Sequence, residues 1–213
     1  MNPVETPLKT DAWIAASWDA YVKAVKDPEL NRAKGYYYQG FMRLEMLPVG
    51  SDHSSDHALM LFAVSLYATL KGIAVTAKDN CSYRKVGIQE CQPDISYYVG
   101  TKALAIPRGT NIVDLNKYPA PDVVIEIAKS SLLDDQGAKR LLYEDLGVGE
   151  YWIVDVERGK ITAFTVANQG SYRIRESQLI VGLQMITLEQ ALKQSQEADQ
   201  TQVGSWLMQQ FSA

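Results

Sequence analysis

Cysteine and histidine are both scarce in this chain of 213 residues, which contains two of each. The two cysteines, Cys81 and Cys91, are too few for the disulfide framework of a small secreted protein, so we expect them to be unpaired structural thiols. The sequence before Asp11 has no basic segment followed by an apolar one, which argues against a secretory signal. These absences favour a cytoplasmic protein.

The two histidines, His53 and His57, lie four residues apart in the segment DHSSDH. This segment lacks the glutamate of the H-E-x-x-H zinc motif. We also expect it to straddle the start of a helix rather than to lie within one. A histidine-rich zinc site is therefore not expected here.

The chain also lacks a long apolar run and an excess of positive charge. Its longest apolar stretch, Ala58–Leu70, is interrupted by Ser65 and Thr69 and is shorter than the roughly 18 residues of a membrane span. Lysine and arginine total 21 against 25 for aspartate and glutamate, which gives a formal net charge of −4. The whole-chain field does not favour a polyanion, so a nucleic-acid partner would require a local basic patch and a metal ion.

Motifs of several common enzyme classes are absent as well. The sequence contains no G-x-S-x-G elbow, no Walker G-x-x-x-x-G-K-[ST] loop, no G-x-G-x-x-G fingerprint and no Cys-x-x-Cys pair. What is present is an ordinary globular composition, 46% hydrophobic and 22% charged, which argues against a disordered or coiled-coil chain.

Hydrophobic periodicity predicts a mixture of helices and strands. We expect helices over 11–26, 57–71, 134–146, 187–194 and 199–211, and strands over 41–46, 73–77, 81–84, 94–99, 122–128, 151–154, 161–166 and 171–174. This order predicts a mixed α/β fold with one central sheet. We expect a single domain over 1–213, with an N-terminal helix at 11–26, a core at 36–190 and a C-terminal helical segment at 187–211.

Three carboxylates stand out in the predicted strands. Glu126 lies in the middle of DVVIEIA, an apolar strand that we expect to be central and buried, on the face opposite Ile125 and Ile127. A carboxylate there is costly unless it is paired with a basic side chain or binds a cation, and both interpretations are open. Asp94 follows a proline at the start of another strand, and Glu45 lies on the polar face of a third. Taken alone, Glu45 is expected at the surface.

The helix that follows the Glu126 strand carries Asp135, Lys139 and Tyr143 at positions i, i+4 and i+8. This spacing places them along one side of a helix. One interpretation is a solvated stripe with an Asp–Lys pair. The other is that the helix packs beside the Glu126 strand and directs Lys139 at the carboxylates. After it, GVGEYWIVD predicts a returning strand with Trp152 in the core.

Several blocks of the sequence resemble one known family when they are taken in order. They are QPDISYY at 92–98, APDVVIEIAKSS at 120–131, the run from 135 to 143 followed by GVGEYWIVD, and GFMRLEMLPVGSDHSSDH at 40–57. Together they resemble the Uma2 family, a bacterial group abundant in cyanobacteria that is assigned to the PD-(D/E)XK nucleases as restriction endonucleases. The resemblance covers about 36–190 and implies a restriction-endonuclease-like core, in which helices flank a central mixed β-sheet with a divalent-metal site at one end.

Three residues take family roles by this resemblance. Asp94 matches the aspartate of the Pro-Asp motif, and Glu126 matches the acidic residue of the (D/E)XK half-motif. Glu45 matches an acidic residue of an early strand or helix. The resemblance thus implies Asp94, Glu126 and Glu45 as metal ligands, with Asp94 and Glu126 also catalytic.

The lysine departs from the superfamily pattern. In E-x-K it would fall at position 128, which is Ala128 here, and strand alternation turns Lys129 to the opposite face. The resemblance implies that the lysine has migrated to the following helix, which favours Lys139 over Lys129 as the catalytic residue. His57 sits where the family often has a histidine, so it is either an accessory residue near the metal or an ordinary helix-end histidine.

The activity implied is hydrolysis of DNA phosphodiester bonds with Mg²⁺ or Mn²⁺, because such ions prefer oxygen ligands and activate water. Lys139 would orient that water or stabilise developing charge. A homodimer is expected, because cutting both strands of a duplex usually needs two active sites.

Two alternatives from other classes remain open. The displaced lysine is compatible with a catalytically inactive nuclease fold that acts as a nucleic-acid-binding or regulatory module. The aromatic run Tyr36–Tyr38 and the C-terminal Trp206, Leu207 and Phe211 suggest a structural protein that associates with itself.

Overall fold

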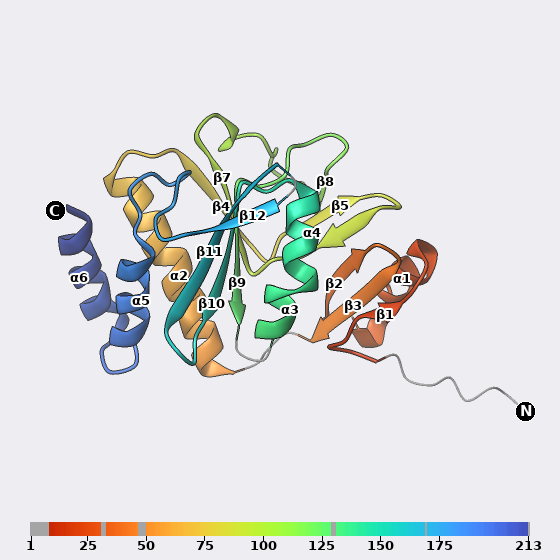
Figure 1. Cartoon of the computed structure of the whole chain (residues 1–213), viewed down its shortest axis with the longest axis horizontal. Coiled ribbons are helices and arrows are strands. Elements are labelled where there is room, and N and C mark those ends of the chain that lie inside the picture. Colours follow the sequence, from red (N-terminus) through yellow and green to blue (C-terminus); the bar gives the residue numbers. More distant parts are fainter. Residues whose placement is uncertain (1–8, 31–32, 47–49, 129–130, 169, 213) are drawn as a thin grey trace, which may run out of the picture.

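The computed structural model describes residues 9–30, 33–46, 50–128, 131–168 and 170–212. These residues form two six-stranded sheets with helices around them (Figure 1). The strand order is β12-β11-β10-β9-β7-β4 in one sheet, called the core sheet here, and β1-β3-β2-β6-β5-β8 in the other, called the flanking sheet. The predicted mixed α/β class is confirmed, and the flanking sheet is an addition to the one central sheet that we expected.

The core sheet is mixed and is built around β9. Its strands are β4 (Val75–Asp79), β7 (Ile95–Val99), β9 (Val123–Ala128), β10 (Glu150–Asp155), β11 (Lys160–Ala167) and β12 (Gly170–Ile174). Strand β9 pairs in parallel with β10 and antiparallel with β7, so it lies inside the sheet. All six of its residues are buried, as its apolar composition predicts.

The flanking sheet joins the N-terminal strands to the segment between β4 and β9. Its strands are β1 (Ile14–Ala15), β2 (Ala33–Tyr38), β3 (Phe41–Met46), β5 (Ser82–Lys85), β6 (Gln89–Cys91) and β8 (Ile112–Asp114). The hairpin of β2 and β3 turns at Gln39 and Gly40, both of which have positive φ.

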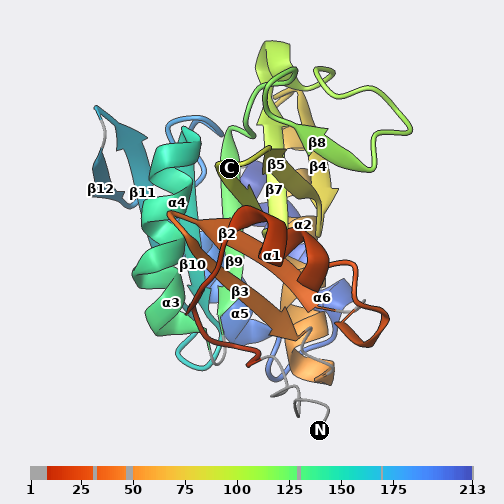
Figure 2. The same ribbon diagram turned by 90° about the vertical axis from the view of Figure 1, so that its right-hand side faces the viewer.

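Most of the helices lie on the two faces of the core sheet, whereas α1 (Trp18–Ala24) packs on the flanking sheet (Figures 1 and 2). The other helices are α2 (Ser51–Leu70), α3 (Leu132–Gln136), α4 (Ala138–Leu146), α5 (Met185–Gln194) and α6 (Gln200–Ser212), with 3-10 turns η1 (Pro28–Leu30) and η2 (Gly100–Lys102). Helices α2, α5 and α6 pack on one face, whereas α4 and the flanking sheet pack on the other. In the part of the chain described, no helix is long and apolar enough to cross a membrane.

The alternation along β9 sends its residues to two different cores. Val123, Ile125 and Ile127 pack with α2, α5 and α6. Val124 and Ala128 pack with α4 and the flanking sheet, so Glu126 faces that side as well. Trp152 of β10 is fully buried, as predicted.

Two predicted helices differ from the observed ones at their N-terminal ends. The helix expected over 11–26 is wrong over residues 11–17, because Ile14 and Ala15 pair with β3. Ser17 caps the shorter helix by accepting the N–H of Ala20. The helix expected from about 57 begins instead at Ser51. The sequence of its first turns predicted a loop, because serine and aspartate are typical of turns and helix caps.

The helix expected over 134–146 is two helices. They are separated at Gly137, whose φ of −106° and ψ of −108° lie outside the helical region. A Cβ at this position would lie 3.0 Å from the carbonyl oxygen of Leu133, so glycine permits the break. The end of α4 at Gly147, in the left-handed conformation, is as predicted.

The residues that suggested self-association belong to the interior. Tyr36, Tyr37, Leu207 and Phe211 are all buried, and Trp206 packs against the same core as Leu207. Tyr38 and Trp206 are half-buried, so this set of aromatic residues leaves little surface for the association that it suggested. Cys81 and Cys91 are both free, which confirms the prediction of unpaired thiols.

Gly35 of β2 allows α1 to approach the flanking sheet closely. A Cβ at this position would contact the Tyr21 hydroxyl and lie 2.9 Å from Cγ1 of Val25, and Tyr21 is itself fully buried. We therefore expect Gly35→Ala to lower the free energy of unfolding by about 1–3 kcal/mol, measured by urea denaturation. Gly170→Ala is the matched control, because a Cβ there meets open space. Equal stability of the two variants would contradict the close approach.

Candidate active site

Asp94 and Glu126 come together because β7 and β9 are neighbours. Ile95 of β7 pairs with Ile125 of β9, which brings Asp94, just before β7, beside the end of β9. The Oδ2 atom of Asp94 accepts the Ile127 N–H at 2.7 Å. Both carboxylates are almost completely buried, so the structure brings together the two residues that the sequence predicts as metal ligands.

Lys139 of α4 reaches Glu126 from the face of the core sheet on which α4 packs. Its Nζ lies 2.9 Å from Oε2 of Glu45, 2.9 Å from Oδ1 of Asp135 and 3.8 Å from Oε1 of Glu126. The lysine is fully buried. The helix containing Lys139 therefore packs beside the Glu126 strand, and the solvated stripe is excluded.

Glu45 is directed inward, not towards solvent as its isolated position suggested. The β2–β3 hairpin turns one face, including Tyr37 and Leu44, to α1, and its other face to the core sheet. Arg43 and Glu45 lie on that second face, where the Nε of Arg43 is 3.1 Å from Oε2 of Glu45. Glu45 thus contacts Arg43 and Lys139.

Lys34 is a site residue that the sequence analysis missed. It is 2% exposed and forms an ion pair with Asp94. It lies directly opposite Glu45 in the register of β2 and β3. Strand alternation was the available signal, because it places the Lys34 side chain on the same face of β2 as the aromatic side chain of Tyr36. Tyr36 is fully buried in the structure. What the sequence did not reveal is that this face meets the core sheet.

Two tyrosine hydroxyls converge on Glu126. Tyr143 of α4 donates to Oε1 at 2.6 Å, and Tyr36 of β2 donates to the same atom at 3.3 Å. Tyr143 follows Lys139 by one helical turn, as the i, i+4 spacing predicts. These hydroxyls hold the orientation of the Glu126 side chain.

Burial and charge drive the two central carboxylates in opposite directions. Burial, opposed only in part by Lys139, raises the pKa of Glu126 to about 8. Burial also disfavours ionised Asp94, but Lys34 and the Ile127 N–H outweigh it and lower the pKa of Asp94 to about 2. Two acids with pKa values on either side of neutrality are typical of functional sites.

The two other carboxylates near Lys139 also differ. Burial raises the pKa of Asp135, despite the nearby lysine. For Glu45 burial acts in the same direction, but Lys139 and Arg43 outweigh it and lower its pKa. Burial disfavours charged Lys139, yet Glu126, Asp135 and Glu45 raise its pKa above the usual value.

When all of its carboxylates are ionised, the cluster carries an excess of negative charge that suits a bound cation. Its ion pairs join five carboxylates to three cations, Asp94, Glu45, Glu126, Asp135 and Asp134 to Lys34, Lys139 and Arg43. Oxygen donors of this kind fit Mg²⁺ or Mn²⁺. Asp94 and Glu126 are the residues that would hold the ion, while Glu45 is engaged by Lys139.

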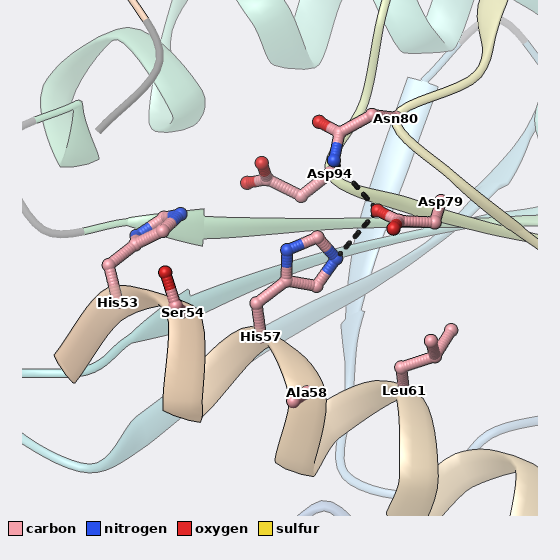
Figure 3. Close-up of a pocket in the computed structure, with 8 residues that line it drawn as sticks. All are labelled: His53, Ser54, His57, Ala58, Leu61, Asp79, Asn80 and Asp94. Atoms are coloured by element: carbon pink, nitrogen blue, oxygen red, sulfur yellow. Dashed lines mark hydrogen bonds and ion pairs between the residues drawn. The ribbon is translucent and has the colours of Figure 1, made fainter. Parts of the chain in front are cut away.

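A pocket of about 340 Å³ adjoins Asp94 on the side of α2 (Figure 3). His53 and His57 project into it from α2, and Asp79 and Asn80 lie across from His57. The expectation that the two histidines straddle a helix start is wrong, because α2 begins at Ser51 and carries both. His57 is therefore well inside the helix.

Lys129, the less favoured candidate for the catalytic lysine, lies outside the described residues. The preference for Lys139 stands on its own contacts with Glu45, Asp135 and Glu126.

Comparisons with known proteins place these features in a family. The model of the Uma2 family, described as "Putative restriction endonuclease", matches residues 20–201. No curated protein matches the chain significantly. In structure, the chain is similar to a crystal structure described as that of "a putative nuclease belonging to DUF820" from Anabaena variabilis ATCC 29413, with a TM-score of 0.53 and 19% identity over 90% of this chain and 98% of that chain. At this identity the likeness shows the fold, which is the nuclease-like fold that the resemblance implied.

Proposed function

This chain belongs to the Uma2 family of restriction-endonuclease-like proteins, and from that premise we propose that it is a metal-dependent endonuclease that hydrolyses DNA phosphodiester bonds. The observation that carries the proposal is the meeting of Asp94, Glu126 and Lys139 at one end of the core sheet. Lys139 comes from α4, whereas a lysine of the E-x-K pattern would come from β9.

In this proposal Asp94 and Glu126 hold Mg²⁺ or Mn²⁺. A bound ion of this kind neutralises phosphate charge and lowers the pKa of an attacking water. Asp94 is kept ionised by Lys34 and the Ile127 N–H, and Tyr143 and Tyr36 orient Glu126. Glu45 remains a predicted third ligand that now pairs with Lys139.

Lys139 is proposed to act as a compact cation next to the reacting phosphate. Its contacts with Asp135 and Glu45, both at 2.9 Å, hold the ammonium group in place. From there it would orient the attacking water or stabilise the charge that develops on the phosphate. A homodimer with two such sites would cut both strands of a duplex.

A second candidate function follows from the same ion pairs. Lys34 and Lys139 already compensate the carboxylates that would hold the ion. An inactive nuclease fold that binds nucleic acid or acts as a regulatory module would look similar. Activity and metal binding separate the two.

A plasmid-nicking assay tests the proposed nuclease. Wild-type protein should convert supercoiled plasmid to nicked circles with Mg²⁺ or Mn²⁺ but not with EDTA. Asp94→Asn and Glu126→Gln should each lower the rate by roughly 10²–10⁴-fold, because a metal ion contributes several kcal/mol of charge stabilisation and each 1.4 kcal/mol is tenfold in rate. Glu157→Gln, at an exposed residue after β10, is the matched control and should cut at the wild-type rate.

Cutting that survives both Asp94→Asn and Glu126→Gln would contradict the assignment of the site. If wild-type protein cuts nothing under any metal condition but shifts DNA in a gel, the inactive module is supported instead.

A further inference from the structure

We propose that His53, His57 and Asp94 form a second metal site, selective for a transition-metal ion of the Zn²⁺ type, beside the oxygen-lined site of Asp94 and Glu126. It shares Asp94 with the proposed nuclease site but does not rest on nuclease activity. The site lies in the pocket between α2 and the loop joining β4 to β5 (Figure 3).

The geometry of α2 creates this group of ligands. His53 and His57 are four residues apart within one continuous helix, so their rings stand on the same face, with centroids 6.4 Å apart. One ligand atom from each histidine and one from Asp94 lie within 4.8 Å of one another. Ligands bound to Zn²⁺ at about 2.0–2.2 Å lie roughly 3–4 Å apart, so small side-chain rotations complete the site.

The unpartnered ring nitrogen of His53 indicates that a ligand binds here. It is 8% exposed, and its Nδ1 has no hydrogen-bond partner among the described residues. A buried ring nitrogen without a partner costs free energy, and native structures normally satisfy it. In Figure 3 the ring faces the side of the pocket where Asp94 lies. A metal ion bound there would satisfy this nitrogen.

Asp79 supplies the support that a metal-binding histidine usually has. Its Oδ1 lies 3.2 Å from Nε2 of His57 and accepts the side-chain amide of Asn80 at 2.7 Å, and Figure 3 draws both contacts. Metal-ligating histidines commonly donate their other ring N–H to a carboxylate, which fixes the tautomer and the ring orientation. Nε2 of His57 lies near Asp79 without a hydrogen bond to it in this structure. A small rotation of the ring would form that bond and leave Nδ1 for the metal.

The donor set determines the kind of ion. Two imidazole nitrogens and one carboxylate are ligands of Zn²⁺ and related transition metals, whereas Mg²⁺ prefers oxygen and keeps its water. Three protein ligands also leave a position open for water or substrate, and the pocket has room for it. Asp94 would therefore lie between two metal sites, a nitrogen-rich one on the α2 side and an all-oxygen one on the Glu126 side.

Cobalt absorption spectroscopy tests the proposal on tag-free protein. Co²⁺ substitutes for Zn²⁺ and gives visible d–d bands when it is bound in a protein site. We expect one saturable equivalent that Zn²⁺ displaces and excess Mg²⁺ does not. In excess Mg²⁺, which fills the oxygen-lined site, His53→Ala and His57→Ala should each weaken Co²⁺ binding at least 100-fold. Glu157→Gln, at an exposed residue, should leave the spectrum and the affinity unchanged.

Asp79→Asn examines the support of His57 without removing a ligand. We expect a 10–100-fold loss of Co²⁺ affinity, the usual effect of removing a carboxylate behind a metal-binding histidine. Asp52→Asn is the matched control, because Asp52 is an exposed aspartate on the same helix next to His53, and it should bind Co²⁺ like wild type.

A measurement on wild-type protein covers the case in which a variant fails to fold. The chain has only two histidines, so its NMR spectrum contains imidazole signals from His53 and His57 alone. Zn²⁺ should shift both histidines with one equivalent. The proposal is overturned if Zn²⁺ shifts the signals of neither histidine, or if Co²⁺ binding in excess Mg²⁺ persists without the histidines. If wild-type protein binds Co²⁺ as expected but nicks no plasmid, the result counts against the proposed nuclease and not against this site.

Discussion

Replacing Lys139 with methionine is expected to lower the free energy of unfolding by about 3–5 kcal/mol, the usual cost of removing one partner from a buried ion pair. Lys139 is fully buried and compensates Glu45, Asp135 and Glu126 at once. Methionine preserves most of the side-chain volume, so the loss reflects the uncompensated carboxylates and not a cavity.

Urea denaturation with EDTA present, at constant pH, measures this loss. Lys117→Met is the matched control, because Lys117 is 73% exposed and its pair with Asp114 is a surface contact. Such pairs contribute little to stability, so the control should unfold like wild type. A Lys139→Met protein as stable as the control would mean that the buried acids are protonated or rearranged in solution.

The metal-free protein is expected to lose stability as the pH rises from about 5 to 8, because Glu126 ionises in the unfolded chain over this range but is kept protonated in its buried site. Its pKa in the folded protein, raised by burial to about 8, lies above the usual value of 4.5. A group raised in this way stabilises the fold fully below its unfolded pKa, and that contribution disappears as the pH passes the folded pKa. The slope from one such group reaches about 1.4 kcal/mol per pH unit.

Glu126→Gln should remove this slope, because glutamine stays neutral at every pH. The experiment is urea denaturation at a series of pH values with EDTA, comparing wild type, Glu126→Gln and the exposed control Glu157→Gln. Asp135, whose pKa is also raised by burial, leaves some slope in every variant.

Asp94 behaves in the opposite way, because its lowered pKa stabilises the fold above about pH 4 and that contribution is lost as the pH falls towards 2. Identical slopes in wild type and Glu126→Gln would show that Glu126 is ionised throughout.

Local periodicity was enough to predict half of the candidate site. Alternation along β9 placed Glu126 opposite Ile125 and Ile127, and the i, i+4 spacing placed Lys139 next to Asp135, despite the helix break at Gly137. Both predictions depend only on residues close in sequence, whose geometry is set by backbone repeat. The family came separately, from the resemblance of several sequence blocks taken in order, and the family model over residues 20–201 shows it.

The parts that failed depend on segments distant in sequence. Taken alone, the Glu45 strand indicated a surface position, and only the family resemblance implied a site role for Glu45. Lys34 was not predicted, because nothing local shows that the second face of the β2–β3 hairpin packs on the core sheet. The same is true of the pocket, where the start of α2 at Ser51 and the neighbouring end of β9 bring His53 and His57 to Asp94.

The sequence by itself determined the fold class, the buried Glu126 strand and the helix that carries Lys139, because each is encoded in a repeat of two or about four residues. Only the tertiary structure decided which charges meet. Lys34 pairs with Asp94, Glu45 with Lys139, and both histidines face Asp94. Those meetings depend on how the sheets and α2 pack against one another, and packing between layers has no signature in any single segment.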